Sequence, residues 1–226
     1  MHAIKLFFMI AISIANLVPM LAQGADKQSA PDQIILDVTS KIMGIVADAD
    51  EYFNVDPERY FEEIDEALSD LVDWRGFARG VMGPYGSQQY YRGLDKDGQR
   101  RLREQLNRFT LQLRHGLIRS YAKGLLAFGG ANMEVSGMEP SPENKRLASV
   151  IQLVYGEASR TYTIRYQMGK YKDGIWRLRN LIIENINLGE IYQNQFVALA
   201  EDFNGDIDRV IDDWNSLLPD KKVEMK

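Results

Sequence analysis

The chain has 226 residues, of which 45% are hydrophobic and 26% charged, and its formal net charge at pH 7 is −5. This length suits one globular domain, and the acidic balance argues against binding to nucleic acid or permanently to anionic membranes. The absence of cysteine excludes disulfides, thiolate catalysis, zinc sites that use cysteine, and lipid attachment through an N-terminal cysteine.

The first residues have the pattern of a secretory signal peptide. Lys5 precedes an apolar run over residues 6–21, and small residues follow around Gly24. The run is short for a membrane span, which needs about 20 apolar residues. We therefore expect residues 1–24 to be removed on export and residues 25–226 to form a single domain. An uncleaved membrane anchor is the alternative.

Three helices are predicted in the first part of the chain. Apolar residues recur at steps of three and four over residues 31–46, which is typical of an amphipathic helix. Asp56 followed by Pro57 is a helix start signal and opens a second amphipathic helix over residues 57–72. A short third helix is expected within residues 73–83.

The longest predicted helix covers residues 95–126 and has two distinct faces. One face is an apolar stripe, and the other is rich in arginine. The arginine face is either an ordinary solvated surface or a docking patch for acidic partners or lipid phosphate, because arginine can form two parallel hydrogen bonds to such groups. Within this face, Arg108 and Arg114 are the candidate partner-binding residues.

The apolar period then changes to two, which is typical of strands. Strands are expected at residues 132–138, 147–155, 161–168 and 174–188, separated by turn-rich segments. We expect an antiparallel meander of four, or at most five, strands. The last strand is apolar on both faces over residues 181–183, so its second face also needs a cover.

Two helices are expected to close the chain, at residues 189–203 and 206–217. Asn187 with Glu190 three residues later is a capping signal for the first of them. The acids around Gly205 superficially resemble a calcium loop, but the glycine stands at position 4 of the loop and not at position 6. A helix end followed by a helix start is therefore favoured. The predicted fold is α+β, with a helical layer packed on the sheet.

The sequence contains no strong pattern of residues for catalysis or for metal binding. After removal of the leader, His115 is the only histidine, and the acids at residues 62–70 are typical of a solvated helix face. Neither a metal nor a cofactor is expected. An enzyme remains an alternative if Asp73 and Tyr166 converge as proton-transfer partners in a cleft.

The surplus of aromatic residues, together with the two-sided apolar strand, favours an apolar pocket between the sheet and the helices. Each candidate lining residue also fits ordinary core packing. The candidates are Trp74, Phe77, Val81, Phe109, Leu113, Leu117, Tyr121, Ile164, Tyr166, Trp176, Leu178, Ile182, Ile186, Phe196 and Leu199.

Three segments resemble the MlaC family of periplasmic phospholipid-binding proteins, also called the toluene-tolerance family. They are "VDWRGFARGVMGPYG", "LNRFTLQLRHGLIRSYAKGLLAFGG" and "YQMGKYKDGIWRLRNLIIENINLGEIYQNQF". The similarity extends over about residues 33–217. The chain departs from the family pattern at Gln193, where an arginine is usual, and at Gly86, where a tryptophan is common.

The resemblance implies a non-enzymatic carrier in the periplasm, with phospholipid as its cargo and no cofactor. The acyl chains would lie between the sheet and the helices. The implied partners are an outer-membrane lipoprotein–porin complex and the substrate-binding subunit of an inner-membrane ABC transporter. A structural adaptor that uses the arginine face of residues 95–126 is a further alternative to the carrier.

Overall fold

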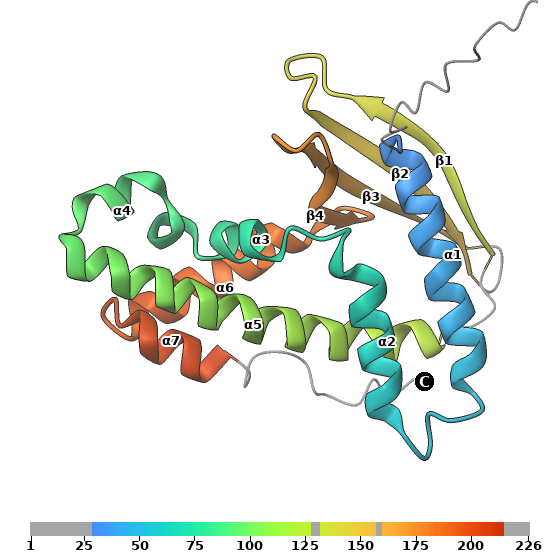
Figure 1. The fold of residues 1–226 in the computed structure, drawn as a ribbon, viewed down its shortest axis with the longest axis horizontal. Coiled ribbons are helices and arrows are strands. Elements are labelled where there is room, and N and C mark those ends of the chain that lie inside the picture. Colours follow the sequence, from blue (N-terminus) through green and yellow to red (C-terminus); the bar gives the residue numbers. More distant parts are fainter. Residues whose placement is uncertain (1–28, 128–131, 157–159, 215–226) are drawn as a thin grey trace, which may run out of the picture.

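The computed structural model describes residues 29–127, 132–156 and 160–214 (Figure 1). The predicted leader and the predicted end of the last helix at residue 217 lie outside these residues. Within the described part, no helix is long and apolar enough to cross a membrane. The elements in chain order are α1 (Pro31–Ala49), α2 (Pro57–Ser69), α3 (Trp74–Val81), η1 (Gly83–Gly86), α4 (Gln88–Gly93), α5 (Lys96–Ala127), β1 (Asn132–Pro140), β2 (Leu147–Tyr155), β3 (Thr161–Lys170), β4 (Trp176–Ile183), β5 (Ile186–Asn187), α6 (Leu188–Asp202) and α7 (Ile207–Asp213).

The helix starts follow from local capping chemistry. The side chain of Asp56 accepts a hydrogen bond from the backbone N–H of Arg59, and Pro57 occupies the first turn of α2. The side chain of Asn187 accepts a hydrogen bond from the N–H of Glu190 at the start of α6, as its spacing predicts. The short elements η1 and α4 were not predicted, because they contain too few residues to show a period.

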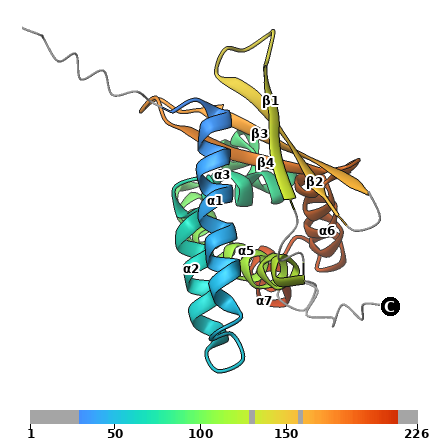
Figure 2. The same ribbon diagram turned by 90° about the vertical axis from the view of Figure 1, so that its right-hand side faces the viewer.

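The five strands form one antiparallel sheet in the order β1-β2-β3-β4-β5. Along β2 the burial alternates, with Ala148, Val150, Gln152 and Val154 buried on one face. Figures 1 and 2 show the helices gathered on one side of the sheet, with α1 crossing beside β1 and β2. The predicted α+β fold is confirmed.

The single strand predicted at residues 174–188 is corrected to two strands. Glu184 has a φ of +55°, which turns the chain sharply after β4. Ile183 then pairs with Ile186, so β5 folds back on β4 as the fifth strand. Sequence reasoning missed the turn because Glu184 and Asn185 are only two polar residues inside an apolar run and no glycine or proline marks the position.

A β-bulge explains why the alternation of β4 breaks. Gln167 of β3 pairs with Asn180, whereas the next residue, Met168, pairs with Leu178. Arg179 is therefore an extra residue without a partner on β3. A bulge of this kind redirects the side chains of the strand and bends it. Residues on both sides of Arg179 can consequently face the same interior.

The described core residues form three clusters. The largest joins α3, α5, α6 and α7 around Phe109, whose ring centroid lies 4.9 Å from that of Phe196 and 5.0 Å from that of Trp214. A second cluster joins α1, α2 and α5 around Tyr60. A third joins α1 to the sheet through the contact of Ile35 with β2 and β3. The long helix α5 is thus shared by two clusters.

We expect Phe109→Ala to lower the free energy of unfolding by about 3–5 kcal/mol, because the substitution empties the centre of the largest cluster. Urea unfolding followed by circular dichroism measures the change. Leu111→Ala is the matched control on the same helix, since Leu111 is 68% exposed and its truncation should cost less than about 0.5 kcal/mol. Equal losses in the two variants would contradict the assignment of the core.

Candidate functional site: an apolar cavity between sheet and helices

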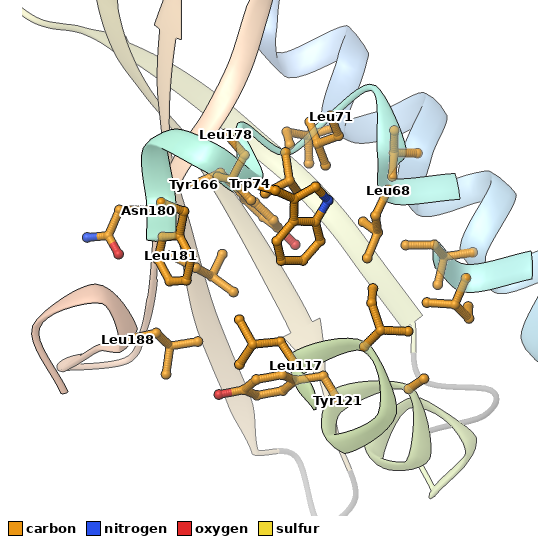
Figure 3. Close-up of a pocket in the computed structure, with 18 of the residues that line it drawn as sticks. Leu68, Leu71, Trp74, Leu117, Tyr121, Tyr166, Leu178, Asn180, Leu181 and Leu188 are labelled. Carbon is orange, nitrogen blue, oxygen red and sulfur yellow. The ribbon is translucent and has the colours of Figure 1, made fainter. Parts of the chain in front are cut away.

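A cavity of about 210 Å³ lies between the sheet and helices α1, α2, α3, α5 and α6. Figure 3 shows Leu68 and Trp74 facing Leu117 across it, with Leu181 on the strand side. Its walls are almost entirely apolar side chains. The cavity is therefore a hollow that the protein's own side chains leave unfilled, whereas protein interiors are usually closely packed.

Backbone hydrogen bonds between the α2–α3 junction and β4 position one wall. The N–H of Leu178 donates to the carbonyl oxygen of Leu71 at 2.7 Å, and the N–H of Asp73 donates to the carbonyl oxygen of Leu178 at 3.1 Å. These bonds bring Leu71, Trp74 and Leu178 to the same side of the cavity, as Figure 3 shows. Residues 178–181 of β4 all contribute to the lining, which is the consequence of the bulge at Arg179.

The structure places six of the fifteen sequence-predicted residues in the cavity lining. They come from α3, α5, β3 and β4. They are Trp74, Phe77, Leu117, Tyr121, Tyr166 and Leu178.

Five predicted residues lie instead in the core cluster around Phe109. The apolar stripe of α5 is longer than the cavity, so its first half packs against α6 and α7 and only its second half reaches the hollow. Periodicity cannot separate the two halves, because both are apolar at the same spacing. These residues are Val81, Phe109, Leu113, Phe196 and Leu199.

The remaining four predicted residues belong to the strands and also lie outside the cavity lining. Trp176 packs against the cluster that joins α1 to the sheet. Ile186, in β5, is 52% exposed. Ile164 and Ile182, in β3 and β4, are partly buried. The bulge and the tight turn after β4 changed which positions face inward, and neither is visible in the hydrophobic pattern.

Sequence reasoning missed lining residues from α1, the second half of α5, β4 and α6. The spacing of three and four along α1 marked its apolar face, but the sequence does not show that this face closes a hollow. The missed residues include Ile35, Val38, Ile42, Ile118, Leu125, Leu181, Leu188 and Tyr192.

Several polar groups in the cavity wall have hydrogen-bond partners within the protein. The hydroxyl of Tyr166 donates to Gln152 Oε1 at 2.6 Å, and Gln152 Nε2 donates to Thr39 Oγ1 at 2.9 Å. The hydroxyls of Tyr121 and Tyr192 share a hydrogen bond of 3.1 Å. Burial raises the pKa of both Tyr166 and Tyr192 far above the ordinary value. These phenols are neutral at physiological pH, and Arg179 is the one charged residue among the described residues that line the cavity.

The proposed proton-transfer pair of the enzyme alternative does not form. The side chain of Asp73 caps α3 by accepting from the N–H of Gly76 at 2.9 Å, and it also accepts from the hydroxyl of Tyr171. Burial, followed by the bond to Asp73, raises the pKa of Tyr171 to about 12. Tyr166 bonds to Gln152 instead. Asp73 and Tyr166 therefore have separate structural partners.

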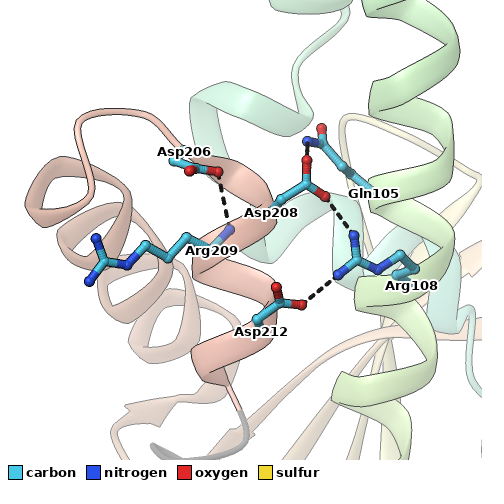
Figure 4. Close-up of polar contacts among 6 residues, drawn as sticks. All are labelled: Gln105, Arg108, Asp206, Asp208, Arg209 and Asp212. Atoms are coloured by element: carbon cyan, nitrogen blue, oxygen red, sulfur yellow. Dashed lines mark hydrogen bonds and ion pairs between the residues drawn. The ribbon is translucent and has the colours of Figure 1, made fainter.

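The two arginines of the predicted docking patch are paired within the chain. Arg108 donates to Asp208 at 2.6 Å and to Asp212 at 2.5 Å, which fastens α7 to α5 (Figure 4). Arg114 donates to both carboxylate oxygens of Asp65 at 2.6 and 2.9 Å, which fastens α2 to α5. Both guanidinium groups thus have carboxylate partners, and the expected cationic patch is neutralised at these positions.

The acids of the calcium-like segment also have structural partners. The side chain of Asp206 caps α7 by accepting from the N–H of Arg209 at 3.2 Å, and Asp208 binds Gln105 as well as Arg108 (Figure 4). Gly205 has a φ of +82°, the left-handed conformation that ends many helices. The segment is a helix end and a helix start.

The fold and the cavity define a small α+β protein built around an apolar binding hollow. The family model described as "MlaC protein" matches residues 36–216, well over half of the chain. The chain belongs to the MlaC family.

Two relatives extend this result. The chain is 24% identical over 196 residues to the toluene tolerance protein ttg2D of Pseudomonas putida, a match that covers 87% of this chain and 83% of the relative. The solved structure of a phospholipid-binding protein from Ralstonia solanacearum, in complex with a phospholipid, superposes with a TM-score of 0.67 at 16% identity. That superposition covers 84% of this chain and 99% of the other, and it shows a shared fold.

We expect the cavity tyrosines to ionise only when the protein unfolds in alkali. Burial raises the pKa of Tyr166 and Tyr192 above the ordinary value of about 10, so the folded state holds these protons more tightly than the unfolded chain. Their contribution to stability is fully present below pH of about 10 and is lost as the pH rises through the folded pKa. Ultraviolet titration of tyrosine together with circular dichroism tests this. Ionisation of all 11 tyrosines near pH 10 without unfolding would contradict it.

Proposed function

We propose that this protein is a periplasmic phospholipid carrier whose apolar cavity holds the acyl chains. The unfilled and largely apolar hollow between the sheet and the helices carries the proposal, because an apolar guest is the ligand that such a lining favours. Membership of the MlaC family and the phospholipid bound by the Ralstonia protein of the same fold support it. The protein acts by shielding its cargo and performs no catalysis.

The energetics of such a carrier follow from the length of its cargo. Two acyl tails hold about 30 methylenes, and at about 0.8 kcal/mol each they would cost roughly 24 kcal/mol to expose to water. A dry cavity must therefore supply nearly all of the apolar contacts that the tails make in the bilayer. The bilayer buries the tails equally well, so the free energy of moving a lipid between membrane and carrier is close to zero. The direction of transport is then set by partners and not by this chain.

The size of the hollow indicates that loading widens it. About 210 Å³ is below the range of about 300–1,000 Å³ of pockets that hold drug-sized ligands. A lipid with two tails therefore needs the cavity walls to move apart. The walls that would have to separate belong to helices α1, α2 and α5 and to the sheet.

The proposed partners lie at the two membranes. We propose that the protein leaves the cytoplasm with residues 1–24 as a cleaved leader and works as a single domain in the periplasm. It would then exchange lipid with an outer-membrane lipoprotein–porin complex and with the substrate-binding subunit of an inner-membrane ABC transporter. Family membership supports this arrangement.

Native mass spectrometry of the protein isolated from a Gram-negative periplasm should show bound phospholipid and a mature chain that begins at Ala25. The hydrophobic gain of two buried tails makes loss of the lipid during isolation unfavourable. Organic extraction and lipid analysis of the same sample provide an independent check. Repeated isolation of protein without lipid would refute the carrier function.

We expect Leu117→Trp to reduce the bound lipid about tenfold, because a larger side chain occupies the cavity and overpacking costs about 1–3 kcal/mol. Phosphorus per mole of protein measures the content. The matched control is Leu111→Trp on the exposed face of the same helix, which should retain the lipid. Thermal unfolding of both variants separates loss of lipid from loss of fold. A full lipid content in folded Leu117→Trp would place the acyl chains elsewhere.

A further inference from the structure

A second hollow adjoins the apolar cavity and has a different character. It is a cleft of about 860 Å³ between α3, α6 and the strands, with many polar side chains in its lining. Phe77, Arg179 and Asn180 line both the cavity and the cleft. These three residues mark the boundary where an apolar compartment meets a polar one. An amphiphile that filled the cavity with its tails would place its polar end at this boundary.

Asn180 fixes the boundary in place. Its Nδ2 group donates to Gln167 Oε1 and to Asn187 Oδ1, both at 2.9 Å, and its Oδ1 accepts from the N–H of Gly189 at 3.0 Å. Figure 3 shows its amide turned away from Trp74 and Leu117. The amide thereby ties β4 to the start of α6, and its hydrogen-bonding groups are already occupied.

Arg179 differs from Asn180 because no hydrogen bond or ion pair with a described residue holds its guanidinium group, whose charge acts on the nearby Tyr171 by lowering the pKa of that phenol against the larger effect of burial. It is the extra residue of the bulge in β4, and a Cβ atom at Gly169 would lie 2.5 Å from its Cδ, so the glycine leaves room for the side chain to cross. Arg179 makes no hydrogen bond or ion pair with any described residue. By contrast, its neighbour Arg177 pairs with Asp173 at 2.9 Å. Arg179 is also the one cation among the described residues that line the cleft.

The lining of the cleft also contains one carboxylate, that of Glu190, that no cationic side chain among the described residues pairs with. Two acids line it, and of these Glu139 already pairs with Arg165. Glu190 lies in the first turn of α6, where its backbone N–H bonds to Asn187. Its carboxylate makes no hydrogen bond or ion pair with a described residue, Arg179 included. The cleft therefore presents a separate free cation and a separate free anion.

We infer that the polar cleft is a headgroup site selective for zwitterionic aminophospholipids, with Arg179 binding the phosphate and Glu190 binding the ammonium group. The inference rests on the proposed function, since the tails occupy the adjoining cavity. The guanidinium fork matches a phosphate geometrically. A headgroup that ends in hydroxyls would leave the carboxylate of Glu190 without a cation, and this difference gives selectivity.

The test offers the protein two lipids in competition. The full mature chain is incubated with vesicles of equimolar phosphatidylethanolamine and phosphatidylglycerol with identical acyl chains, and the bound lipids are quantified by mass spectrometry. We expect phosphatidylethanolamine to be enriched about three- to tenfold, as the strength of charge-assisted hydrogen bonds suggests. Arg179→Gln should weaken binding of both lipids, because both carry the phosphate. Glu190→Gln should abolish the preference, because only one lipid carries the amine.

Matched controls lie on the same two elements. Arg177→Gln on β4 and Glu201→Gln on α6 change the same charges outside the cleft lining, and both should keep the wild-type ratio. Lipid bound in the ratio of the vesicles, and unchanged in the Arg179 and Glu190 variants, would overturn the headgroup site while leaving the carrier function intact. Absence of lipid from every variant and from the wild type would instead overturn the carrier function itself.

A further experiment distinguishes a lipid headgroup from a soluble phosphate ester as the ligand of the cleft. Glycerophosphoethanolamine has the same headgroup without tails, and calorimetry should detect no binding to the protein at millimolar concentration, because the tails supply most of the affinity. Binding of this compound that depends on Arg179 would assign the cleft to a soluble ligand and would overturn the inference.

Discussion

The structure depends on keeping an apolar hollow open between the sheet and the helices. Protein interiors normally close such spaces, since an empty cavity loses van der Waals contacts on every side. Here the walls come from well-anchored elements, and the hydroxyls of Tyr166 and Tyr121 find partners within the wall. One polar atom is an exception, because Trp74 Nε1 is buried without a partner among the described residues. The lining thus favours an apolar guest and offers water little to bind.

The helix α5 contributes both to the core of the protein and to the wall of the cavity. Its first half packs through Phe109 into a dense core, and its second half presents Leu117 to the hollow. Its arginines hold the neighbouring helices, with Arg108 bonded to α7 and Arg114 bonded to α2. Exposed ion pairs of this kind contribute little free energy each, but they fix where the helices lie. A rigid core beside an unfilled cavity suits a carrier whose walls must separate around a guest.

The strand β4 separates the apolar compartment from the polar one. Its bulge gives Arg179 no partner on β3, and its sharp turn at Glu184 leads through β5 into α6. As a result, Leu178 faces the cavity while Arg179 stands at the boundary with the cleft that Glu190 also lines. The two departures from regular strand geometry therefore position the groups that would distinguish one lipid from another.

The sequence by itself determined the longer helices, the first three strands and the family. The spacing in residues 31–46, the caps at Asp56 and Asn187, and the change of period after α5 are local signals, and local physics fixes their outcome. The sequence did not determine which apolar residues enclose the hollow, because Phe109 and Leu117 share one stripe and differ only in what packs against them. It also left open the partners of Arg108 and Arg114, which lie far away in the chain. Burial, cavities and ion pairs between distant segments exist only once the helices and the sheet have come together.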